Sequence, residues 1–329
     1  MLLAGDIGGT KTVLALFSEA LGPRQPLVEK TFPSDDYESL LAVINAFMAG
    51  RPDGVLTGAA FGIAGPVMNN RVQTTNLPWT IEAEELADYL NLPGRVYLLN
   101  DLEATATGVP TLLPDELVTL QAGEPEPEAA IGVVAPGTGL GEAYLTWDGQ
   151  RYRAHPSEGG HAGFGPETDT EFELLTYMRG QLDHVSFERV CSGIGIPNLY
   201  AFWRDSGRYE EPDWLRGALA AAEDPVPIIA QAALEEKAAI CSATMGLFVD
   251  ILGSEAGNMA LKLAALGGVY LGGGIPPRIL PLLQGPRFLA AFKRKGRFAA
   301  LLSRMPVHVI LNRQLALSGA ARYGLEVAV

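Results

Sequence analysis

The feature that most constrains the fold of this chain is a glycine-rich turn between two apolar runs near its beginning. Residues 2–17 read LLAGDIGGTKTVLALF, and each flank has the length and composition of a buried strand. The turn combines glycines with an acid, two hydroxyls and an amine, at Gly5, Gly8, Gly9, Asp6, Thr10, Thr12 and Lys11. Glycines allow backbone N–H groups to converge on a phosphate, and the two threonine hydroxyls can add hydrogen bonds. The stretch therefore predicts an anion cradle on a strand–turn–strand hairpin, with a plain buried hairpin as the alternative.

The residues after this turn distinguish it from a Walker phosphate-binding loop. That loop requires glycine directly before the lysine, where this chain has Thr10, and it opens a helix. Here Val13–Phe17 is a continuous apolar run that predicts a strand. We expect the next elements to be a strand near 27–32, a helix that begins at Ser34 and a strand within 54–64. This β-β-β-α-β order departs from the alternating order of a Rossmann domain.

A second hairpin of the same kind occurs further along the chain. Ile131–Val134 and Ala143–Trp147 are strand-like and enclose a turn with Gly137, Thr138 and Gly139. The repetition predicts a duplicated α/β architecture in which two halves face each other across a cleft, each with one phosphate-binding turn.

Length and composition limit the classes of protein that this chain can be. With 329 residues it is long enough for two domains, and the proline-rich loop at 110–127 is the best candidate boundary. The net charge of −14 would repel a polyanionic backbone, which argues against nucleic acid as a partner. No run reaches the roughly 18 uninterrupted apolar residues of a membrane helix, and the N-terminus lacks a basic signal-peptide region. We therefore expect a cytoplasmic protein with no membrane partner. Cys191 and Cys241 lack the CxxC spacing of a zinc site, and we expect both to be buried.

Several polar residues lie at strand ends or in glycine-rich loops, where side chains commonly face a cleft: Asn100, Asp101, Glu158, His161 and Glu188. Their carboxylates, amide and imidazole can satisfy the hydroxyls of a sugar, because a carboxylate accepts two hydrogen bonds from a vicinal diol. The same carboxylates could hold a divalent metal, and their spacing does not decide between the two. Asn100 and Asp101 also suit the N-cap of a helix, since they stand at a strand-to-helix junction.

Six motifs, taken in order, resemble those of the bacterial glucokinase family. They are Gly5-Asp6-Ile7-Gly8-Gly9-Thr10, Gly62-Ile63-Ala64-Gly65-Pro66 with Asn76-Leu77-Pro78-Trp79, Asn100-Asp101-x-Glu103-Ala104, Gly137-Thr138-Gly139-Leu140-Gly141, Glu158-Gly159-Gly160-His161 and Glu188-Arg189-Val190-x-Ser192-Gly193. With the turn at 272–274 they extend over nearly the whole chain, and as an ordered set they are highly specific.

The resemblance implies the two-domain actin-like (ribonuclease H-like) ATPase fold, an α/β fold with duplicated β-β-β-α-β-α cores and a central cleft. It assigns 1–112 plus 312–329 to a small domain and 113–311 to a large one. It also implies that a cytoplasmic homodimer transfers the γ-phosphoryl group of ATP, with Mg²⁺, to the 6-hydroxyl of D-glucose, yielding glucose 6-phosphate.

Carried over residue by residue, the resemblance also assigns the site. Asp101 takes the position of the catalytic base, and the glucose-binding positions are Asn100, Asp101, Glu158, His161 and Glu188. The phosphate positions are Gly8, Gly9, Thr10 and Lys11 together with Gly137, Thr138 and Gly139, and the adenosine positions are Gly273 and Gly274. Asp6 is expected to contact the metal through water.

Some alternatives to this assignment stay open. Lys11 stands where many members of the family carry asparagine, which can alter donor preference among ATP, other nucleotides and polyphosphate. A hexose kinase of broader or different sugar specificity would share these motifs, because only the geometry of hydrogen bonds rejects an epimer. A non-enzymatic member of the same ATPase fold would keep the glycine turns but have no use for Glu158, His161 and Glu188. A sugar-sensing regulator would keep those three but needs a DNA-binding element, for which we see no room before residue 5.

Overall fold

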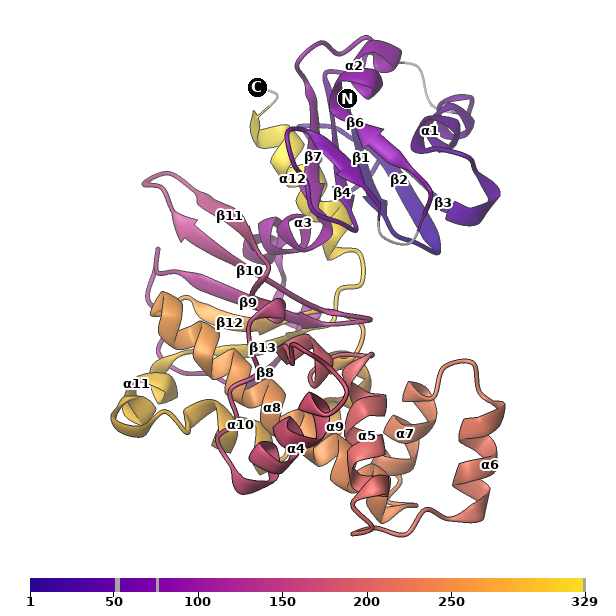
Figure 1. The fold of residues 1–329 in the computed structure, drawn as a ribbon. Helices are drawn as coiled ribbons and strands as arrows, with labels where there is room; N and C mark the ends of the chain where they lie inside the picture. Colours follow the sequence, from indigo (N-terminus) through magenta and orange to yellow (C-terminus); the bar gives the residue numbers. More distant parts are fainter. Residues whose placement is uncertain (51–53, 75–76, 328–329) are drawn as a thin grey trace. The chain divides into compact units, whose positions relative to one another are not determined.

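A computed structural model describes residues 1–50, 54–74 and 77–327 of the chain (Figure 1). Asn76, one residue of the quoted motifs, lies outside the described residues. The chain forms two compact units. The first comprises Met1–Pro114, Ala143–Pro156 and Asn312–Val329, and the second comprises Asp115–Glu142 and Ser157–Leu311. Unlike the division implied by the resemblance, this one groups the hairpin segment Ala143–Pro156 with the first unit.

The first unit is built on a five-stranded sheet. In spatial order its strands are β3 (Val28–Pro33), β2 (Lys11–Phe17), β1 (Leu2–Ile7), β4 (Gly58–Ile63) and β7 (Val96–Asn100). The first hairpin is antiparallel, whereas β4 is parallel to both β1 and β7. The predicted order β-β-β-α-β is confirmed, and a strand rather than a helix follows the first glycine turn.

Helices cover both faces of this sheet. Successive side chains of a strand point to opposite faces, and the apolar side chains of β1 are buried on both. The elements outside the sheet are α1 (Leu40–Met48), α2 (Ala83–Leu90), α3 (Asp101–Gly108), α12 (Leu315–Val327) and the small pair β5 (Arg71–Gln73) and β6 (Thr80–Glu82). Leu3 and Ile7 of β1 belong to the core beneath α1 and α2, whereas Leu2 and Ala4 pack with α3 and α12. Asp6, by the same alternation, lies on the face that α3 covers.

The helix α1 begins later than expected. Its N-cap is Ser39, whose hydroxyl accepts the N–H of Ala42 at 3.2 Å. The prediction of a helix beginning at Ser34 is wrong, since 34–36 form only a turn of 3₁₀-helix. The hydroxyl of Ser34 instead donates to the carbonyl oxygen of Gly8 at 2.8 Å. Ser34 is therefore part of the glycine turn and not of the helix.

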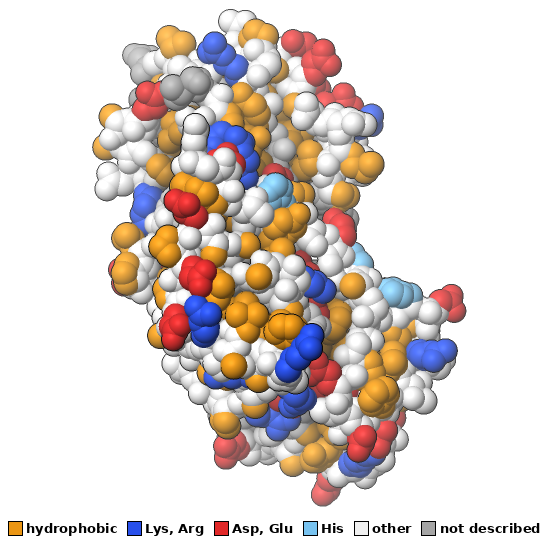
Figure 2. All heavy atoms as spheres, turned by 90° about the vertical axis from the view of Figure 1, so that its left-hand side faces the viewer, with side chains coloured by type: hydrophobic (Ala, Val, Ile, Leu, Met, Phe, Trp, Pro, Cys, Tyr) orange, Lys and Arg blue, Asp and Glu red, His pale blue; other side chains and the backbone are white. Residues whose placement is uncertain are grey.

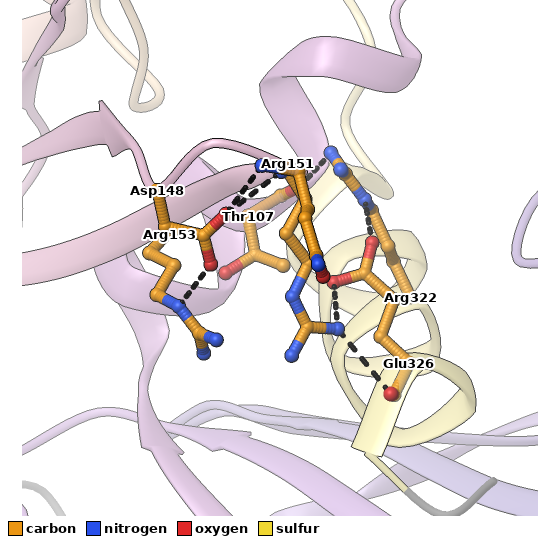
Figure 3. Close-up of polar contacts among 7 residues, drawn as sticks. Thr107, Asp148, Arg151, Arg153, Arg322 and Glu326 are labelled. Carbon is orange, nitrogen blue, oxygen red and sulfur yellow. Dashed lines mark hydrogen bonds and ion pairs between the residues drawn. The ribbon is translucent and has the colours of Figure 1, made fainter.

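The hairpin segment Ala143–Pro156 is tied to α12 by an arginine–glutamate network (Figure 3). Nη1 of Arg151 donates to Oε2 of Glu326 at 3.1 Å, and Nε of Arg322 donates to Oε1 of the same carboxylate at 2.7 Å. Arg322 also reaches back to the carbonyl oxygen of Thr107 in α3 at 3.0 Å. One carboxylate thus joins the hairpin, the last helix and α3 within the first unit.

The other large sheet has six strands. In spatial order they are β11 (Tyr152–Ser157), β10 (Leu140–Trp147), β9 (Ile131–Pro136), β12 (Gly268–Leu271), β13 (Val307–Ile310) and β8 (Leu117–Gln121). Of these, β9, β12, β13 and β8 belong to the second unit, and β10 and β11 lie mostly in the segment Ala143–Pro156. The prediction of an unbroken loop over 110–127 is wrong, because β8 pairs antiparallel with β13. Its partner strand lies nearly two hundred residues away in the sequence, so local patterning does not reveal it.

Helices make up most of the rest of the second unit. They are α4 (Asp169–Arg179), α5 (Gly195–Asp205), α6 (Asp213–Ala221), α7 (Val226–Leu234), α8 (Ala239–Leu263), α9 (Leu280–Leu283), α10 (Pro286–Lys293) and α11 (Ala299–Arg304). Among the described residues, α8 alone is long and apolar enough to cross a membrane by length and composition. It packs against α5, α7 and α10, and most of its apolar residues are buried, so it forms the core of this unit. Cys191 and Cys241 are both buried free cysteines, as expected.

Charged side chains are spread over the surface rather than segregated. On the face drawn in Figure 2, Lys and Arg side chains are interspersed with Asp and Glu. Together with the net charge of −14, this distribution gives a polyanion little to bind on that face.

Candidate active site

The glycine turn of the first unit is held from behind by backbone contacts. The N–H of Gly8 donates to the carbonyl oxygen of Lys11 at 3.0 Å, and the N–H of Ser34 donates to that of Thr10 at 3.0 Å. Thr10 and Lys11 are exposed and can reach a ligand. Thr12, by contrast, is 0% exposed and its hydroxyl bonds the hydroxyl of Ser34 at 3.1 Å. The prediction that Thr12 offers a hydroxyl to a phosphate is therefore wrong.

Asp6 and Asp101 lie close together in the first unit because their strands are close neighbours in the sheet. Asp6 is in register with Gly62 of β4, and Ile63 of β4 is in register with Asn100 of β7, which leads directly into α3. Burial, with the charge of Asp101 as a smaller cause, raises the pKa of Asp6 to about 6, and Lys11 opposes the shift. A buried carboxylate beside a second carboxylate is stabilised by any cation that reaches it.

The junction between β7 and α3 is capped by Asn100 and not by Asp101. Oδ1 of Asn100 accepts the N–H of Leu102 at 2.9 Å and that of Glu103 at 3.4 Å, while Nδ2 donates to the carbonyl oxygen of Gly65 at 3.0 Å. Oδ1 of Asp101 accepts the N–H of Leu102 at 2.8 Å, which orients its carboxylate. The helix-cap interpretation is thus confirmed for Asn100.

In the second unit, the predicted sugar residues Glu158, His161 and Glu188 come together. Nε2 of His161 lies 3.9 Å from Oε2 of Glu158, and Nδ1 lies 3.9 Å from Oε1 of Glu188. The side chains of Glu158 and His161 are 73% and 61% exposed, whereas that of Glu188 is 18% exposed. Two acceptor groups on either side of one imidazole form an open polar cluster, which suits the hydroxyls of a sugar.

Backbone contacts fix the loop that carries Glu158 and His161 against the segment that carries Glu188. The N–H of Phe187 donates to the carbonyl oxygen of Ala162 at 3.0 Å, and the N–H of Phe164 donates to that of Val185 at 2.8 Å. The rings of Phe164 and Phe187 meet edge to face with centroids 5.6 Å apart. The polar cluster is therefore supported by two hydrogen-bonded backbone segments and by the contact between Phe164 and Phe187.

The second glycine turn, 137–139, touches the polar cluster through one residue. Oε2 of Glu188 accepts the N–H of Leu140 at 3.0 Å, directly after the turn. The same oxygen lies 2.3 Å from the position of a Cβ on Gly139, so only glycine allows this approach. Glu188 thereby links the second glycine turn to the predicted sugar residues Glu158 and His161.

A cavity of about 480 Å³ opens beside this turn within the second unit. Its lining includes three of the predicted donor residues, Gly137, Thr138 and Gly274. Gly273 has a φ of +79°, and a Cβ built on it would lie only 2.5 Å from the carbonyl oxygen of Pro136. The second and third glycine turns thus border one cavity.

Sequence reasoning missed other residues that line this cavity, namely Gly193, Ile194, Asp224, Val226, Ile275 and Arg278. Val226, Ile275 and Arg278 also line an adjoining, more apolar pocket of about 320 Å³ between α7, α8 and the 3₁₀-helix after β12. A cavity of mixed polarity beside a more apolar one suits phosphates and a planar base, respectively. Arg278 follows the third glycine turn closely and could have been noticed there, whereas Asp224 carries no local signal.

Among residues 1–50, 54–74 and 77–327, no group of three or more His, Cys, Asp or Glu side chains forms a metal cluster. A magnesium ion, however, is commonly held by one or two carboxylates plus the phosphates of a substrate. Asp6 and Asp101 present oxygen donors of this kind beside the first glycine turn. The residues present therefore fit a magnesium ion that a nucleotide brings with it.

Comparisons with known proteins show the family to which this chain is similar. A family model described as "Glucokinase" matches residues 3–326. A curated protein of Nostoc punctiforme named "Glucokinase" is 41% identical, with 98% of each chain covered. The solved glucokinase structure of an Antarctic psychrotroph superposes with a TM-score of 0.85 at 32% identity, covering 98% of each chain. A glucokinase structure from Balamuthia mandrillaris in complex with glucose shares the fold, with a TM-score of 0.79 at 23% identity over 99% of this chain and 93% of that one.

Proposed function

This chain belongs to the glucokinase family and transfers the γ-phosphoryl group of ATP to D-glucose, and we propose that Asp101 is the general base of that reaction. Asp101 follows the capped end of β7 with its carboxylate oriented by the N–H of Leu102. In this role it accepts the proton of the 6-hydroxyl as the phosphoryl group arrives. Phosphoryl transfer asks the protein mainly to position groups and stabilise charge.

Asn100, Glu158, His161 and Glu188 bind the other hydroxyls of glucose in this proposal. The observation that carries it is the convergence of Glu158 and Glu188 on the two ring nitrogens of His161. A non-enzymatic member of the same fold would have no use for that arrangement. A glucokinase structure of the same fold contains glucose, which supports the assignment of the sugar.

The two glycine turns hold the donor. In this proposal phosphate is bound by Gly8, Gly9, Thr10 and Lys11 of one turn and by Gly137, Thr138 and Gly139 of the other. Gly273 and Gly274 take the adenosine side, where the two adjoining cavities supply room. Arg278 adds the cationic group of that cavity.

A magnesium ion held by Asp6 through water would neutralise charge on the donor phosphates. Asp6 keeps its place for that role because β1 fixes it beside Asp101. We further propose that the enzyme acts in the cytoplasm as a homodimer, in line with the expectation from its family resemblance.

The test of Asp101 separates chemistry from folding. Asp101→Ala should lower kcat by roughly 10²–10⁴, a larger factor than the rise in the Kd for glucose that the loss of its hydrogen bond to the 6-hydroxyl causes. A coupled assay for glucose 6-phosphate and calorimetric titration with glucose measure the two quantities. Asp88→Asn, an exposed aspartate of α2 in the same unit, serves as the matched control and should keep wild-type kcat. If Asp101→Ala lowers only the melting temperature and keeps kcat, the proposed base is wrong.

The same assay decides the range of sugars and the competing function. Glucose should be turned over with the highest kcat/KM, and mannose, fructose and N-acetylglucosamine are the informative competitors. A comparable kcat/KM for two or more of them would favour a hexose kinase of broader specificity. No turnover with any sugar would favour the non-enzymatic member of the fold.

A further inference from the structure

Two buried glutamates lie directly behind the proposed sugar-binding loop. Glu142 of β10 is 2% exposed and Glu255 of α8 is 0% exposed. Among the described residues the cation paired with them is Lys262, whose Nζ lies 3.6 Å from Oε1 of Glu255. One lysine balances one carboxylate, so a second charge in the pair would be buried without compensation.

The atoms of the two carboxyl groups show how that charge is avoided. In the part of the chain that the structure describes, Oε1 of each carboxyl group accepts no hydrogen bond, although Oε1 of Glu255 is ion-paired with Lys262. Oε2 of Glu255 accepts Nδ2 of Asn258 at 2.9 Å. The two carboxyl groups are close enough for the charge of Glu255 to raise the pKa of Glu142, which favours a proton on the pair. With that proton and Lys262, the group is neutral.

The carboxyl group of Glu142 forms the floor of the loop that carries Glu158 and His161. A Cβ built on Gly159 would lie 1.9 Å from Oε2 of Glu142, so the backbone of the loop rests on this oxygen. The neighbouring Gly160 rests in the same way on the carbonyl oxygen of Leu140, 2.0 Å from its built Cβ. Any displacement of the Glu142 side chain is therefore transmitted to the loop.

We propose that Glu142 and Glu255 share one proton and that the neutral pair holds Gly159 so that Glu158 and His161 are placed for glucose. Glu142 is a positioning residue, since it lies beneath the loop and acts through it. The inference rests on the proposed role of Glu158 and His161 in sugar binding.

The shared proton makes the position of the loop sensitive to alkaline pH. Burial and the charge of Glu255 raise the pKa of Glu142 to about 8, and Lys262 opposes the shift. The other group that faces the pair is the thiol of Cys191, whose pKa is raised well above its usual value by burial and by both carboxylates. The thiol therefore stays neutral while the carboxyl pair titrates, and loss of its proton leaves two repelling charges under Gly159.

Glu142→Gln tests the proposal because its amide keeps the size of the side chain and donates to Glu255 at every pH. We would measure kcat and KM for glucose from about pH 6.5 to about pH 9.5, which brackets the pKa of Glu142. In the wild type, KM for glucose should rise about tenfold above that pKa, with a smaller change in kcat and in KM for ATP. Glu142→Gln should keep KM within about twofold of the wild type near neutrality and lack the alkaline rise.

Two further variants make the result specific. Glu142→Ala leaves Glu255 without its proton partner and should raise KM for glucose about tenfold at every pH. Glu171→Gln is the matched control, because Glu171 is buried in the same unit but its Oε2 accepts the N–H groups of Glu167 and Thr168. It should keep the wild-type pH profile. An unchanged alkaline rise in Glu142→Gln, or a wild-type KM in Glu142→Ala, would overturn the positioning role.

Infrared difference spectroscopy tests the proton itself without any turnover. The wild type at neutral pH should show the C=O stretch of a protonated carboxyl group that is absent from Glu142→Gln. Lack of this difference band would overturn the shared proton. A band that is present while Glu158→Ala leaves KM for glucose unchanged would instead overturn the sugar-binding role of the loop, and with it the positioning role, but not the proton pair.

Discussion

Replacing Gly139 with alanine should weaken glucose binding without unfolding the protein. A Cβ at this position would lie 2.3 Å from Oε2 of Glu188, the oxygen that accepts the N–H of Leu140 at 3.0 Å. The atom that must move is the end of a flexible side chain, so the carboxylate gives way and the backbone stays. The carboxylate of Glu188 then loses its hydrogen bond from the N–H of Leu140. A hydrogen bond with one charged partner is worth ~1.5–3 kcal/mol. The carboxylate also leaves its place 3.9 Å from Nδ1 of His161.

The expected magnitude is set by that hydrogen bond. At ~1.4 kcal/mol per factor of ten, KM for glucose should rise by about 10- to 100-fold. Steady-state kinetics with glucose varied at saturating ATP measures it, and thermal unfolding reports stability. Gly165→Ala is the control, since Gly165 is exposed, lies just after the same sugar loop and has no heavy atom within 4 Å of a built Cβ. A KM within about twofold of the wild type would refute the link between the donor turn and Glu188. A fall of several degrees in melting temperature would show that the backbone had moved instead.

Further predictions concern stability. Gly319→Ala should destabilise the first unit by ~1–3 kcal/mol or more, because a Cβ there would lie 1.7 Å from the carbonyl oxygen of Ala104. Gly217→Ala, on α6 with no heavy atom near a built Cβ, should instead stabilise the protein by ~0.5–1 kcal/mol. Urea unfolding measures both changes, and equal effects on the free energy of unfolding would contradict the packing argument. The raised pKa of Asp6 gives stability that is complete below its ordinary value near 3.8 and is lost as pH rises through about 6, so Asp6→Asn should remove a decline of ~3 kcal/mol between those values. Urea unfolding of the ligand-free protein across this range measures the decline, which should persist in Asp6→Asn if Asp6 is not its cause.

Much of the fold could be predicted because its strongest signals are local. The strand–turn–strand hairpins and the strand at Gly58–Ile63 have local signals in the sequence. The strand Leu117–Gln121 could not be found, because its pairing with β13 is long-range and a proline-rich context hides it. The cap at Ser39 was missed for a different reason, since Ser34 offered an equally good local signal and a tertiary contact claimed it.

The candidate site was predicted unevenly for a related reason. Glycines and carboxylates can be recognised by type and spacing, so Gly137 and Glu188 could be named from the sequence. The hydrogen bond between Glu188 and Leu140 could not, because 48 residues separate the partners. Nothing in the sequence distinguishes Glu142 and Glu255 from exposed charged residues. Their burial and their Oε1 atoms, which accept no hydrogen bond from the described residues, led us to propose the shared proton and are seen only in the structure.

The two glycine turns also show why no helix has to come directly after them. In a Walker loop, the N–H groups at a helix start point at the phosphate. Here the N–H of Gly193, just before α5, donates to the carbonyl oxygen of Gly137 at 2.8 Å, and the N–H of Ser34 donates to that of Thr10 at 3.0 Å. In each hairpin, an N–H group from a later segment of the chain thus binds a carbonyl oxygen of the glycine turn. The N–H groups of Gly8 and Gly137 donate within their own turns, to Lys11 at 3.0 Å and to Gly139 at 2.9 Å, so we expect other N–H groups of the two turns to meet the phosphates.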